Sequence, residues 1–330
     1  MSSLLLLPQA STFAVPSDLL FWAVTAITIF FSVLVAGLIV GFIVVYRRGR
    51  PVDRSHPPIT NLWMEVFWVA GLLALVLPLF GWSGVLYLEA RRVPPDAMEI
   101  FVIGKQWMWE LQHPEGRWEN NELHLPAGRP VVLTMTSRDV IHSFFIPAFR
   151  LKQDVIPGTY TQLAFTPTRT GRFALFCAEY CGTLHSAMTG TVTVMSPGEY
   201  DAWLRADPTR RTPAEVGARL FSEKGCASCH DAGAPLPAPR LAGIYGRDVW
   251  VRGPRPGERP TRLRVDARYL RESMLCPERR IRVGCQPMMP SYQGRLREEE
   301  ILQLIAYIRS LSAASSSRDA LASGVAPPRP

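Results

Sequence analysis

The hydrophobic positions are concentrated near the N-terminus, in two long runs that contain no charged residue. The first run covers residues 19–46 and the second covers residues 66–88. Each run exceeds the roughly 20 residues with which a helix spans about 30 Å of hydrocarbon. We therefore predict a hairpin of two transmembrane helices, at about residues 19–46 and 62–88, within an N-terminal part comprising residues 1–95.

Loop charges predict the orientation of this hairpin. The loop between the two predicted helices contains four arginines and one acidic residue, whereas the segment before the first run has no Lys or Arg. Two arginines follow the second run. Because loop cations tend to stay in the cytoplasm, both termini are expected outside, on the periplasmic side of a bacterial inner membrane. A cleaved signal within residues 1–15 is the weaker alternative, because the apolar residues 4–7 lack a basic segment before them.

The pattern changes after residue 95. Short β-branched and aromatic runs alternate with turn signals at residues 98–103, 131–136, 160–165, 172–176 and 191–195. This spacing predicts an all-β sandwich or barrel over residues 96–200. A short helix is expected at 200–204, within or beside a linker at 201–214. Helical patterning marks both ends of residues 215–312, and the Ser-, Ala- and Pro-rich residues 313–330 are expected to be disordered.

All six cysteines lie after residue 170, in the part expected outside the membrane. In an oxidising compartment such thiols need a partner, which is a metal ion, a haem or another cysteine. The cysteines form three pairs along the chain: Cys177 and Cys181, Cys226 and Cys229, and Cys276 and Cys285.

The first pair lies in a segment rich in soft metal ligands. Residues 176–188 read FCAEYCGTLHSAM, which places Cys177, Cys181, His185 and Met188 directly before a predicted strand. Thiolate, thioether and imidazole together favour copper. A mononuclear blue-copper site uses one cysteine, so the second cysteine implies a second metal ion or a disulfide. His142, in the segment DVIHSF, is the natural candidate for a further imidazole ligand.

This segment resembles the dinuclear CuA site of cytochrome c oxidase subunit II, which is built on a cupredoxin-like Greek-key β-barrel. The alternative is a structural disulfide beside a chance histidine and methionine. The resemblance implies two bridging thiolates, two terminal imidazoles and two weak axial ligands, with a magnesium site at the boundary with the catalytic subunit. By this resemblance, Cys177 and Cys181 would bridge the coppers, and His142 and His185 would be the terminal imidazoles. Met188 and the backbone carbonyl of Glu179 would be the weak axial ligands. The side chain of Glu179 would face the magnesium.

The resemblance extends beyond the copper ligands. Residues 104–109, GKQWMW, resemble the aromatic motif of the family, with Met108 where tyrosine is usual. By analogy an electron from a haem donor enters at Trp107; the alternative is a core aromatic on a strand. Residues 152–158 also match and are assigned structural roles.

Near the start of the second span, Glu65 resembles the carboxylate at the mouth of the proton channel. The alternative for Glu65 is a carboxylate that reaches the lipid headgroups.

The second cysteine pair carries a haem signature. Residues 226–230 read CASCH, in which two thioethers hold haem c and His230 ligates its iron. A zinc or redox site is the weaker alternative. The region resembles a class I cytochrome c, an all-α domain, which implies Met289 as sixth ligand in preference to Met288. A carbonyl near Pro239 would orient His230.

The third pair, Cys276 and Cys285, is predicted to form a disulfide, with free thiols as the alternative.

Charge separates the two outer regions. Residues 96–200 contain 8 basic and 10 acidic residues, and residues 215–312 contain 17 basic and 11 acidic residues. The second region is therefore electrostatically complementary to the first, which favours docking between them. The overall charge of +8 might suggest nucleic-acid binding, but the sequence contains no motif for it.

Together these features predict the subunit at which electrons enter a proton-pumping cytochrome c oxidase of the caa type. Electrons would pass from cytochrome c or another periplasmic donor, through haem c and CuA, to subunit I, where oxygen is reduced to water. The expected partners are subunit I, subunit III and membrane lipid, and no catalytic residue is expected in this chain itself. The alternatives are a CuA-containing subunit of a nitric oxide reductase and a membrane-tethered copper carrier or assembly factor.

Overall fold

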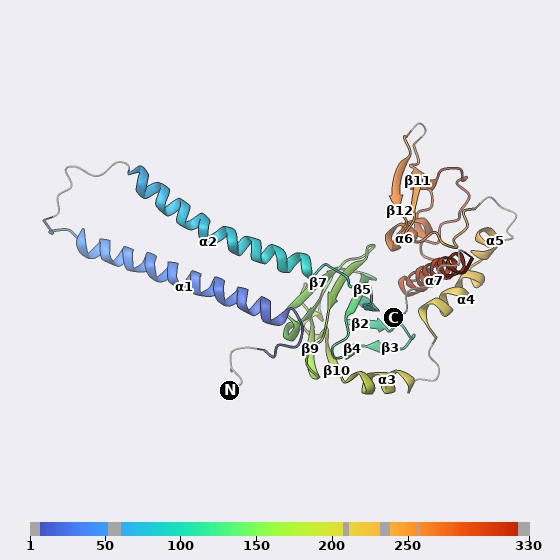
Figure 1. Cartoon of the computed structure of the whole chain (residues 1–330), viewed down its shortest axis with the longest axis horizontal. Helices are drawn as coiled ribbons and strands as arrows, with labels where there is room; N and C mark the ends of the chain where they lie inside the picture. Colours follow the sequence, from blue (N-terminus) through green and yellow to red (C-terminus); the bar gives the residue numbers. More distant parts are fainter. Residues whose placement is uncertain (1–6, 52–60, 207–210, 232–237, 256–257, 323–330) are drawn as a thin grey trace.

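The computed structural model describes residues 7–51, 61–206, 211–231, 238–255 and 258–322. The chain has three parts, which follow one another along its long axis (Figure 1). A helical hairpin projects from one side of a β-domain (residues 96–206). A C-terminal domain (residues 211–322) lies on the other side of the β-domain. The predicted order of two apolar helices, a β-rich domain and a helical region is confirmed.

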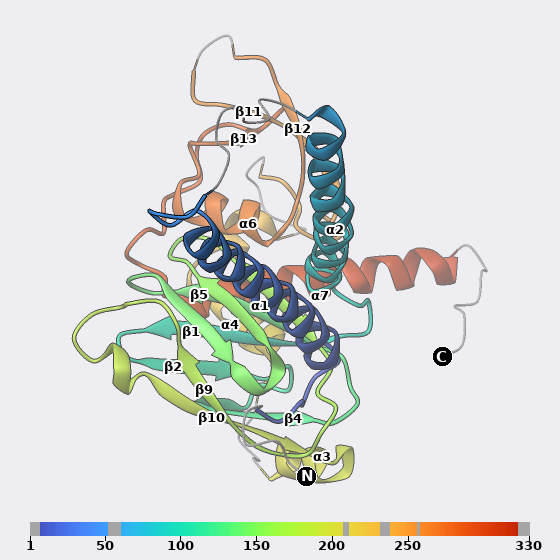
Figure 2. The same ribbon diagram turned by 90° about the vertical axis from the view of Figure 1, so that its left-hand side faces the viewer.

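The hairpin consists of α1 (Ala14–Val45) and α2 (Leu62–Glu89). Both helices are long and apolar enough to cross a membrane, and Figure 2 shows them foreshortened in front of the β-domain. Helix α1 begins five residues earlier than predicted, because the charged Asp18 in its second turn pairs with Arg150 of the β-domain at 2.7 Å. At the start of α2, the Asn61 side chain accepts a hydrogen bond from the amide of Met64 and caps the helix.

A short N-terminal segment ties the hairpin to the β-domain. The amide of Ala10 donates to the carbonyl of Ala148 at 3.0 Å, and Ser11 pairs with Pro167 in an isolated β-bridge. Ala10 and Ser11 are both buried. The segment before α1, the start of α1 and the end of α2 therefore all lie at the β-domain (Figure 1).

The β-domain is a sandwich of two five-stranded sheets, with strand orders β3-β2-β1-β5-β8 and β4-β10-β9-β6-β7. The β1–β5 and β4–β10 pairs are parallel, and the other neighbouring pairs are antiparallel. Two 3₁₀ turns lie between strands, η1 (Pro147–Phe149) and η2 (His185–Ala187). The strands are β1 (Met98–Lys105), β2 (Met108–Gln112), β3 (Trp118–Asn120), β4 (Glu122–Pro126), β5 (Val131–Ser137), β6 (His142–Ile146), β7 (Leu151–Val155), β8 (Thr161–Phe165), β9 (Gly171–Cys177) and β10 (Thr189–Met195).

Large apolar side chains fill the space between the two sheets. Side chains that point inward from the strands, among them Trp109, Leu133, Phe144 and Leu175, are completely buried, and so is Phe149 of η1. Full burial of one such side chain stabilises a fold by about 1.5–3 kcal/mol. This rigid core positions the loops at the ends of the strands.

Helix α3 (Pro197–Arg205) follows the last strand of the sandwich. It is longer than the predicted helix at 200–204, because Ser196 and Glu199 form a capping box at its N-terminus. Tyr200 and Leu204 pack into the core of the β-domain. The connection to the C-terminal domain therefore comprises residues 206–212, of which 207–210 lie outside the described residues.

The C-terminal domain contains α4 (Pro213–Glu223), α5 (Ala227–His230), α6 (Ala267–Leu275) and α7 (Glu298–Ala322). Helices α4 and α7 cross closely at Gly217, where an added Cβ would lie 2.0 Å from the carbonyl oxygen of Gln303. A small sheet of order β12-β11-β13, which the sequence did not predict, joins the helices. Its strands are β11 (Asp248–Arg252), β12 (Thr261–Arg264) and β13 (Ile281–Arg282).

Helix α7 also differs from the prediction at its C-terminal end. Disorder was expected from residue 313, but the helix continues to Ala322. The segment from 313 to 322 is rich in alanine, which has the highest helix propensity of all residues. The remaining part of the predicted disordered tail, residues 323–330, lies outside the described residues.

Candidate metal and haem sites

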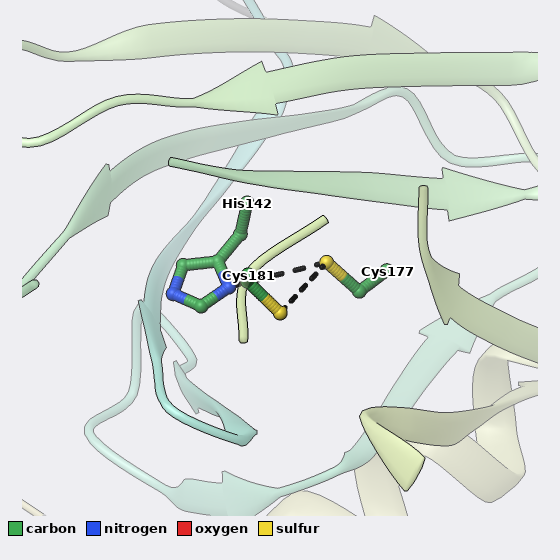
Figure 3. Close-up of side chains that lie close together, drawn as sticks. All are labelled: His142, Cys177 and Cys181. Atoms are coloured by element: carbon green, nitrogen blue, oxygen red, sulfur yellow. Dashed lines mark hydrogen bonds between the residues drawn. The ribbon is translucent and has the colours of Figure 1, made fainter. Parts of the chain in front are cut away.

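Five soft or imidazole donors converge at one end of the sandwich. The Sγ atoms of Cys177 and Cys181 lie 3.8 Å apart, and Nδ1 of His142 is 3.9 Å from Cys177 Sγ. Figure 3 shows these three side chains pointing toward one another. Nδ1 of His185 and Sδ of Met188 lie 3.4 Å and 3.8 Å from Cys181 Sγ. The sequence thus brings together donors from β6, from the end of β9 and from the loop before β10.

The geometry of these donors suits copper. The sulfurs are not bonded to each other, and thiolate sulfur binds metals such as zinc at about 2.3 Å, so ions can contact both sulfurs across a 3.8 Å gap. The backbone carbonyl of Glu179 lies 3.2 Å from Cys177 Sγ. His142 and Met188 are completely buried, and the two cysteines are 8% and 3% exposed. His185 is half-buried. Two thiols, two imidazoles and a thioether at one place form a donor set that favours copper.

The two thiols differ in acidity although they are neighbours. Burial disfavours the Cys177 thiolate, but hydrogen bonds from His142 and from the backbone near it lower its pKa to about 6. Burial and the charge of the neighbouring Cys177 thiolate raise the pKa of Cys181. The pocket therefore holds the first thiolate readily near neutral pH, and release of the second proton is favoured only when a cation is bound.

Asp139 orients the buried imidazole of His142. Its Oδ1 lies 2.8 Å from Nε2 of His142, and its carboxylate accepts hydrogen bonds from the amides of Gln106 and Val140, each at 2.7 Å. Burial opposes ionisation of Asp139, but these bonds lower its pKa. Burial also lowers the pKa of His142, but hydrogen bonds with Cys177 and Asp139 outweigh it and raise that pKa. Such an outer partner fixes the ring so that Nδ1 faces the sulfurs. The sequence analysis did not identify Asp139, although its spacing of three residues before His142 was a usable signal.

Two tryptophans approach the same pocket from the β1–β2 connection. The indole nitrogen of Trp107 donates to the carbonyl of Cys181 at 3.1 Å, and the side chain of Gln106 donates to the same carbonyl at 2.8 Å. Trp109 is completely buried and packs edge-on against His142 and Phe144. Trp107 is thus in direct contact with the ligand loop, whereas Trp109 belongs to the core behind it.

The remaining sequence-predicted residues of the β-domain and hairpin lie outside this pocket. Lys152 and Asp154 are on β7, where Asp154 accepts a hydrogen bond from the hydroxyl of Ser143 at 2.8 Å. Glu65 lies in the first turn of α2, at the end of the hairpin away from the β-domain (Figure 1). The structure therefore brings the predicted copper ligands together and leaves Glu65 far from them.

A second pocket lies in the C-terminal domain, between α5, α6 and α7. Cys226, Cys229 and His230 line one part of it, and Met288 and Met289 line another. Most of the other lining side chains are apolar: Phe221, Leu241, Ile244, Leu270, Met274, Leu304 and Ile308. An apolar pocket with two thiols on one wall suits a covalently attached haem.

The histidine of this pocket is already oriented. Nδ1 of His230 donates to the carbonyl of Pro239 at 2.9 Å, which leaves Nε2 free to face a metal ion. Met289 packs against the apolar core of the domain, whereas Met288 is 46% exposed. The arrangement fits haem c held by the two cysteines, with His230 as one iron ligand and Met289 as the better placed methionine.

The disulfide predicted between Cys276 and Cys285 is not formed. Both residues are unpaired and partly exposed. Cys276 ends α6, and the amide of Cys285 is held by the carbonyl of Arg282 in the turn after β13. Cys276 and Cys285 are therefore held by different elements. The segment between them is held by the pairing of β13 with β11 and not by a disulfide.

A third cluster of titratable groups lies in the β-domain, on the side that carries α3. The Glu119 carboxylate is bonded to Nε2 of His113 at 2.6 Å and to Nδ1 of His124. The hydroxyl of Tyr200 contacts the other nitrogen of His113 at 2.8 Å, and Trp203 stacks on His124. Burial alone would raise the pKa of Glu119, but the two histidines lower it to about 2. The sequence analysis missed this cluster, whose members are spread over residues 113–203.

Two segments of the chain match known protein families, and the chain is similar to several known proteins. Residues 118–195 match the family "Cytochrome C oxidase subunit II, periplasmic domain", and residues 214–312 match the family "Cytochrome c". A probable cytochrome c oxidase subunit 2 of Streptomyces avermitilis is 31% identical over 237 residues, which is 56% of this chain and 72% of the relative. A cytochrome c oxidase subunit 2 of Alkalihalophilus pseudofirmus is 28% identical over 301 residues, with 85% and 82% of the two chains covered.

A further relative is the alternative cytochrome c oxidase subunit 2 of Bradyrhizobium diazoefficiens. It is 33% identical over 178 residues, which is 44% of this chain. The chain spans 63% of the length of that relative. The match to the Alkalihalophilus protein, in contrast, extends over most of both chains, so the combination of parts seen here recurs in one curated relative.

Proposed function

The chain belongs to the cytochrome c oxidase subunit 2 family, and from this premise we propose that it is the subunit at which electrons enter a proton-pumping haem–copper oxidase. One observation carries the proposal. A largely buried cluster of two thiols, two imidazoles and a thioether, together with a separate CASCH pocket, occurs in a single membrane-anchored chain. Both donor sets suit one-electron carriers rather than bond-making chemistry.

We assign the copper pocket to a dinuclear CuA centre. Cys177 and Cys181 would bridge the two ions, His142 and His185 would be terminal ligands, and Met188 and the carbonyl of Glu179 would be weak axial ligands. When bound, such a centre stores one electron with little rearrangement. The chain contributes the rest: the core excludes water, Asp139 holds the His142 ring in place, and the positions of the sulfurs are fixed by β9 and the loop after it.

We assign the second pocket to haem c. Cys226 and Cys229 would form the thioether links, and His230 and Met289 would be the axial ligands. A bound haem supplies a second one-electron carrier, and methionine ligation raises its reduction potential. The contact between His230 and the Pro239 carbonyl holds the imidazole, and the apolar wall formed by α6 and α7 excludes water from the iron site.

Trp107 is the proposed contact for an external donor such as cytochrome c. Its indole is only partly buried and bonds to the carbonyl of Cys181, a proposed copper ligand. A surface aromatic joined by one hydrogen bond to the ligand loop is a suitable place for an electron to enter.

The hairpin and loop charges support anchorage in a bacterial inner membrane, with both redox domains on the outer side. The proposed partners are subunit I, which would reduce oxygen, and subunit III. Glu65, in the first turn of α2, is the proposed carboxylate at the mouth of a proton channel of the complex. The Glu179 side chain is proposed to face a magnesium ion at the boundary with subunit I.

The test is purification of the intact complex, with measurement of its copper and covalent haem content and of its turnover of oxygen and nitric oxide. Two copper ions and one covalent haem in this chain, with oxygen consumption, would support the proposal. Nitric oxide turnover without oxygen consumption would replace it with a nitric oxide reductase. Copper that exchanges freely, without covalent haem, would replace it with a copper carrier.

A further inference from the structure

One face of α7 lies against the β-domain. Glu299, Leu302, Ala306 and Arg309 are spaced by three, four and three residues, which places them in one stripe along a helix. We call these four residues the α7 stripe. Leu302 forms a buried cluster with Phe101 and Ile103 of β1, and Ala306 packs against that cluster.

Ion pairs flank this apolar contact at both ends of the α7 stripe. Arg138, which follows β5, bonds to Glu299 at 2.6 Å and also to Glu110 of β2 at 2.9 Å. Arg309 pairs with Glu99 of β1. The pairs have opposite polarity, because the β-domain supplies the cation in one and the anion in the other. This alternation fixes both the register and the direction of α7 on the sheet.

A third contact lies beside the α7 stripe. Arg271 of α6 donates to the carbonyl of Gly158 at 3.1 Å, in the loop between β7 and β8. Tyr160 follows in that loop and packs against the core of the C-terminal domain as well as against the cluster at β1. Tyr160 therefore packs between the two domains and is half-buried there.

The opposite face of α7 lines the haem pocket. Leu304 and Ile308 are part of the pocket wall, and they lie about half a turn around the helix from Leu302 and Ala306. One helix, about 10 Å across, therefore separates the pocket from β1. In Figure 1, α7 lies between the β-strands and α5, which carries the CASCH motif.

On the other side of the contact, β1 and Arg138 reach the copper pocket. Gly104, which follows Ile103 in β1, is so close to His142 that an added Cβ would lie 3.0 Å from the imidazole ring. The backbone amide of Arg138 donates to the carbonyl of Gly104 at 2.9 Å. The next residue after Arg138 is Asp139, which orients His142. Arg138, which pairs with Glu299 of α7, and Asp139, which orients His142, are therefore adjacent in the chain.

We infer that the α7 stripe is the docking surface that holds the C-terminal domain on the β-domain, and that Arg138 is a positioning residue joining the docked helix to the loop that orients His142. The inference rests on the proposed function only where it treats His142 as a copper ligand. The docking itself depends on residues of this chain alone.

Hydroxyl-radical footprinting of Tyr160 in the purified complex, read by mass spectrometry, tests the docking. The double variant Glu299→Gln/Arg309→Gln removes one partner of each flanking ion pair. Loss of each partly exposed pair lowers the docking equilibrium constant by about two- to fivefold. The docking equilibrium constant should fall by about the product of the two factors, roughly four- to 25-fold. Because Tyr160 is half-buried when docked, its modification rate should rise toward that of a fully exposed tyrosine.

Arg262→Gln is the matched control, because Arg262 pairs with Asp248 within the C-terminal domain, away from the α7 stripe. It should leave the modification rate of Tyr160 unchanged. Trp250, which is 57% exposed on β11, serves as an internal reference in every variant. An unchanged Tyr160 rate in the double variant would overturn the docking surface.

The positioning role of Arg138 has its own readout, the near-infrared absorption of the copper-loaded protein. Glu299→Gln leaves the copper loop untouched, and yet it should shift this absorption if docking acts on His142 through Arg138. Arg138→Ala should give the same shift, and Arg138→Lys should largely restore the original band. Tyr160 exposure without any band shift would refute the positioning role. Absence of copper would instead refute the proposed function, while the Tyr160 measurement would still decide the docking.

Discussion

Oδ1 of Asp139 lies 2.8 Å from Nε2 of His142, on the side of the ring opposite to the sulfurs. The imidazole therefore presents Nδ1 to Cys177, and a carboxylate that is 31% exposed holds it there. The bond joins residues three positions apart in the loop that leads into β6. It makes the orientation of one proposed copper ligand a local property of this loop.

Asp139→Asn should weaken copper binding by about 10- to 100-fold, because the amide no longer holds the imidazole as a charged partner does. Competition with a chelator of known copper affinity measures the change. Asp201→Asn, on the exposed face of α3, is the control and should retain copper as the unmodified protein does. Equal copper affinity in the two variants would show that His142 needs no orienting carboxylate.

Cys181→Ser should abolish the two-copper centre. Cys181 contacts Cys177, His185 and Met188, so its sulfur is common to most of the donor contacts. A serine hydroxyl is a hard and weakly acidic ligand that does not replace a bridging thiolate. Copper content per chain and near-infrared absorption check the result. Cys276→Ser, at the end of α6, should keep both, whereas a Cys181→Ser protein that retained two copper ions would contradict the bridged assignment.

The architecture and most of the candidate ligands could be read from the sequence because those signals are local. Uncharged runs marked the two helices, and CASCH and the segment 176–188 placed several ligands within a few residues. His142 could be named from the sequence only as a candidate, since it comes from β6, 35 positions before Cys177, and its ligand role came from the resemblance. The strands β2, β3, β4, β6 and β7 and the small C-terminal sheet were missed, because each of these strands has at most five residues and shows little periodicity.

Contacts between distant segments were not predictable in the same way. The cluster of His113, Glu119 and His124 forms where β3 of one sheet, β4 of the other and α3 come together, which no local pattern encodes. The charge difference between the two outer regions did predict docking. It did not indicate that individual pairs such as Arg138–Glu299 and Arg309–Glu99 have opposite polarity. That detail depends on which face of α7 meets the sheet.

Met289→Leu should remove the methionine ligand from haem c and lower its reduction potential, because a weakly basic thioether sulfur favours the reduced iron. Met289 packs on the core of the C-terminal domain, whereas the neighbouring Met288 is largely exposed. Met288→Leu is therefore the matched control and should leave the potential and the haem spectrum unchanged. A redox titration of both variants decides the assignment, and the reverse pattern would identify Met288 as the ligand.

Glu119 should give the β-domain a specific sensitivity to acid. Burial opposes its ionisation, but His113 and His124 hold its pKa at about 2 in the folded protein, against an ordinary value of 4.5. Above pH 4.5 the folded and unfolded chains are both ionised here, so the pairing stabilises the fold in full. As the pH falls from 4.5 to 2, the unfolded chain takes up the proton first and this stabilisation is lost.

The lowering of the Glu119 pKa corresponds to about 3 kcal/mol of unfolding free energy. Glu119→Gln should therefore unfold at lower denaturant concentration at pH 7, and its stability should change less between pH 5 and pH 2 than that of the unmodified protein. Denaturant titration of the full chain in detergent, followed across this range, measures both effects. Asp96→Asn, at an exposed position before β1, is the control. Parallel stability curves for Glu119→Gln and the unmodified protein below pH 5 would mean that the two histidines do not hold the charge of this carboxylate.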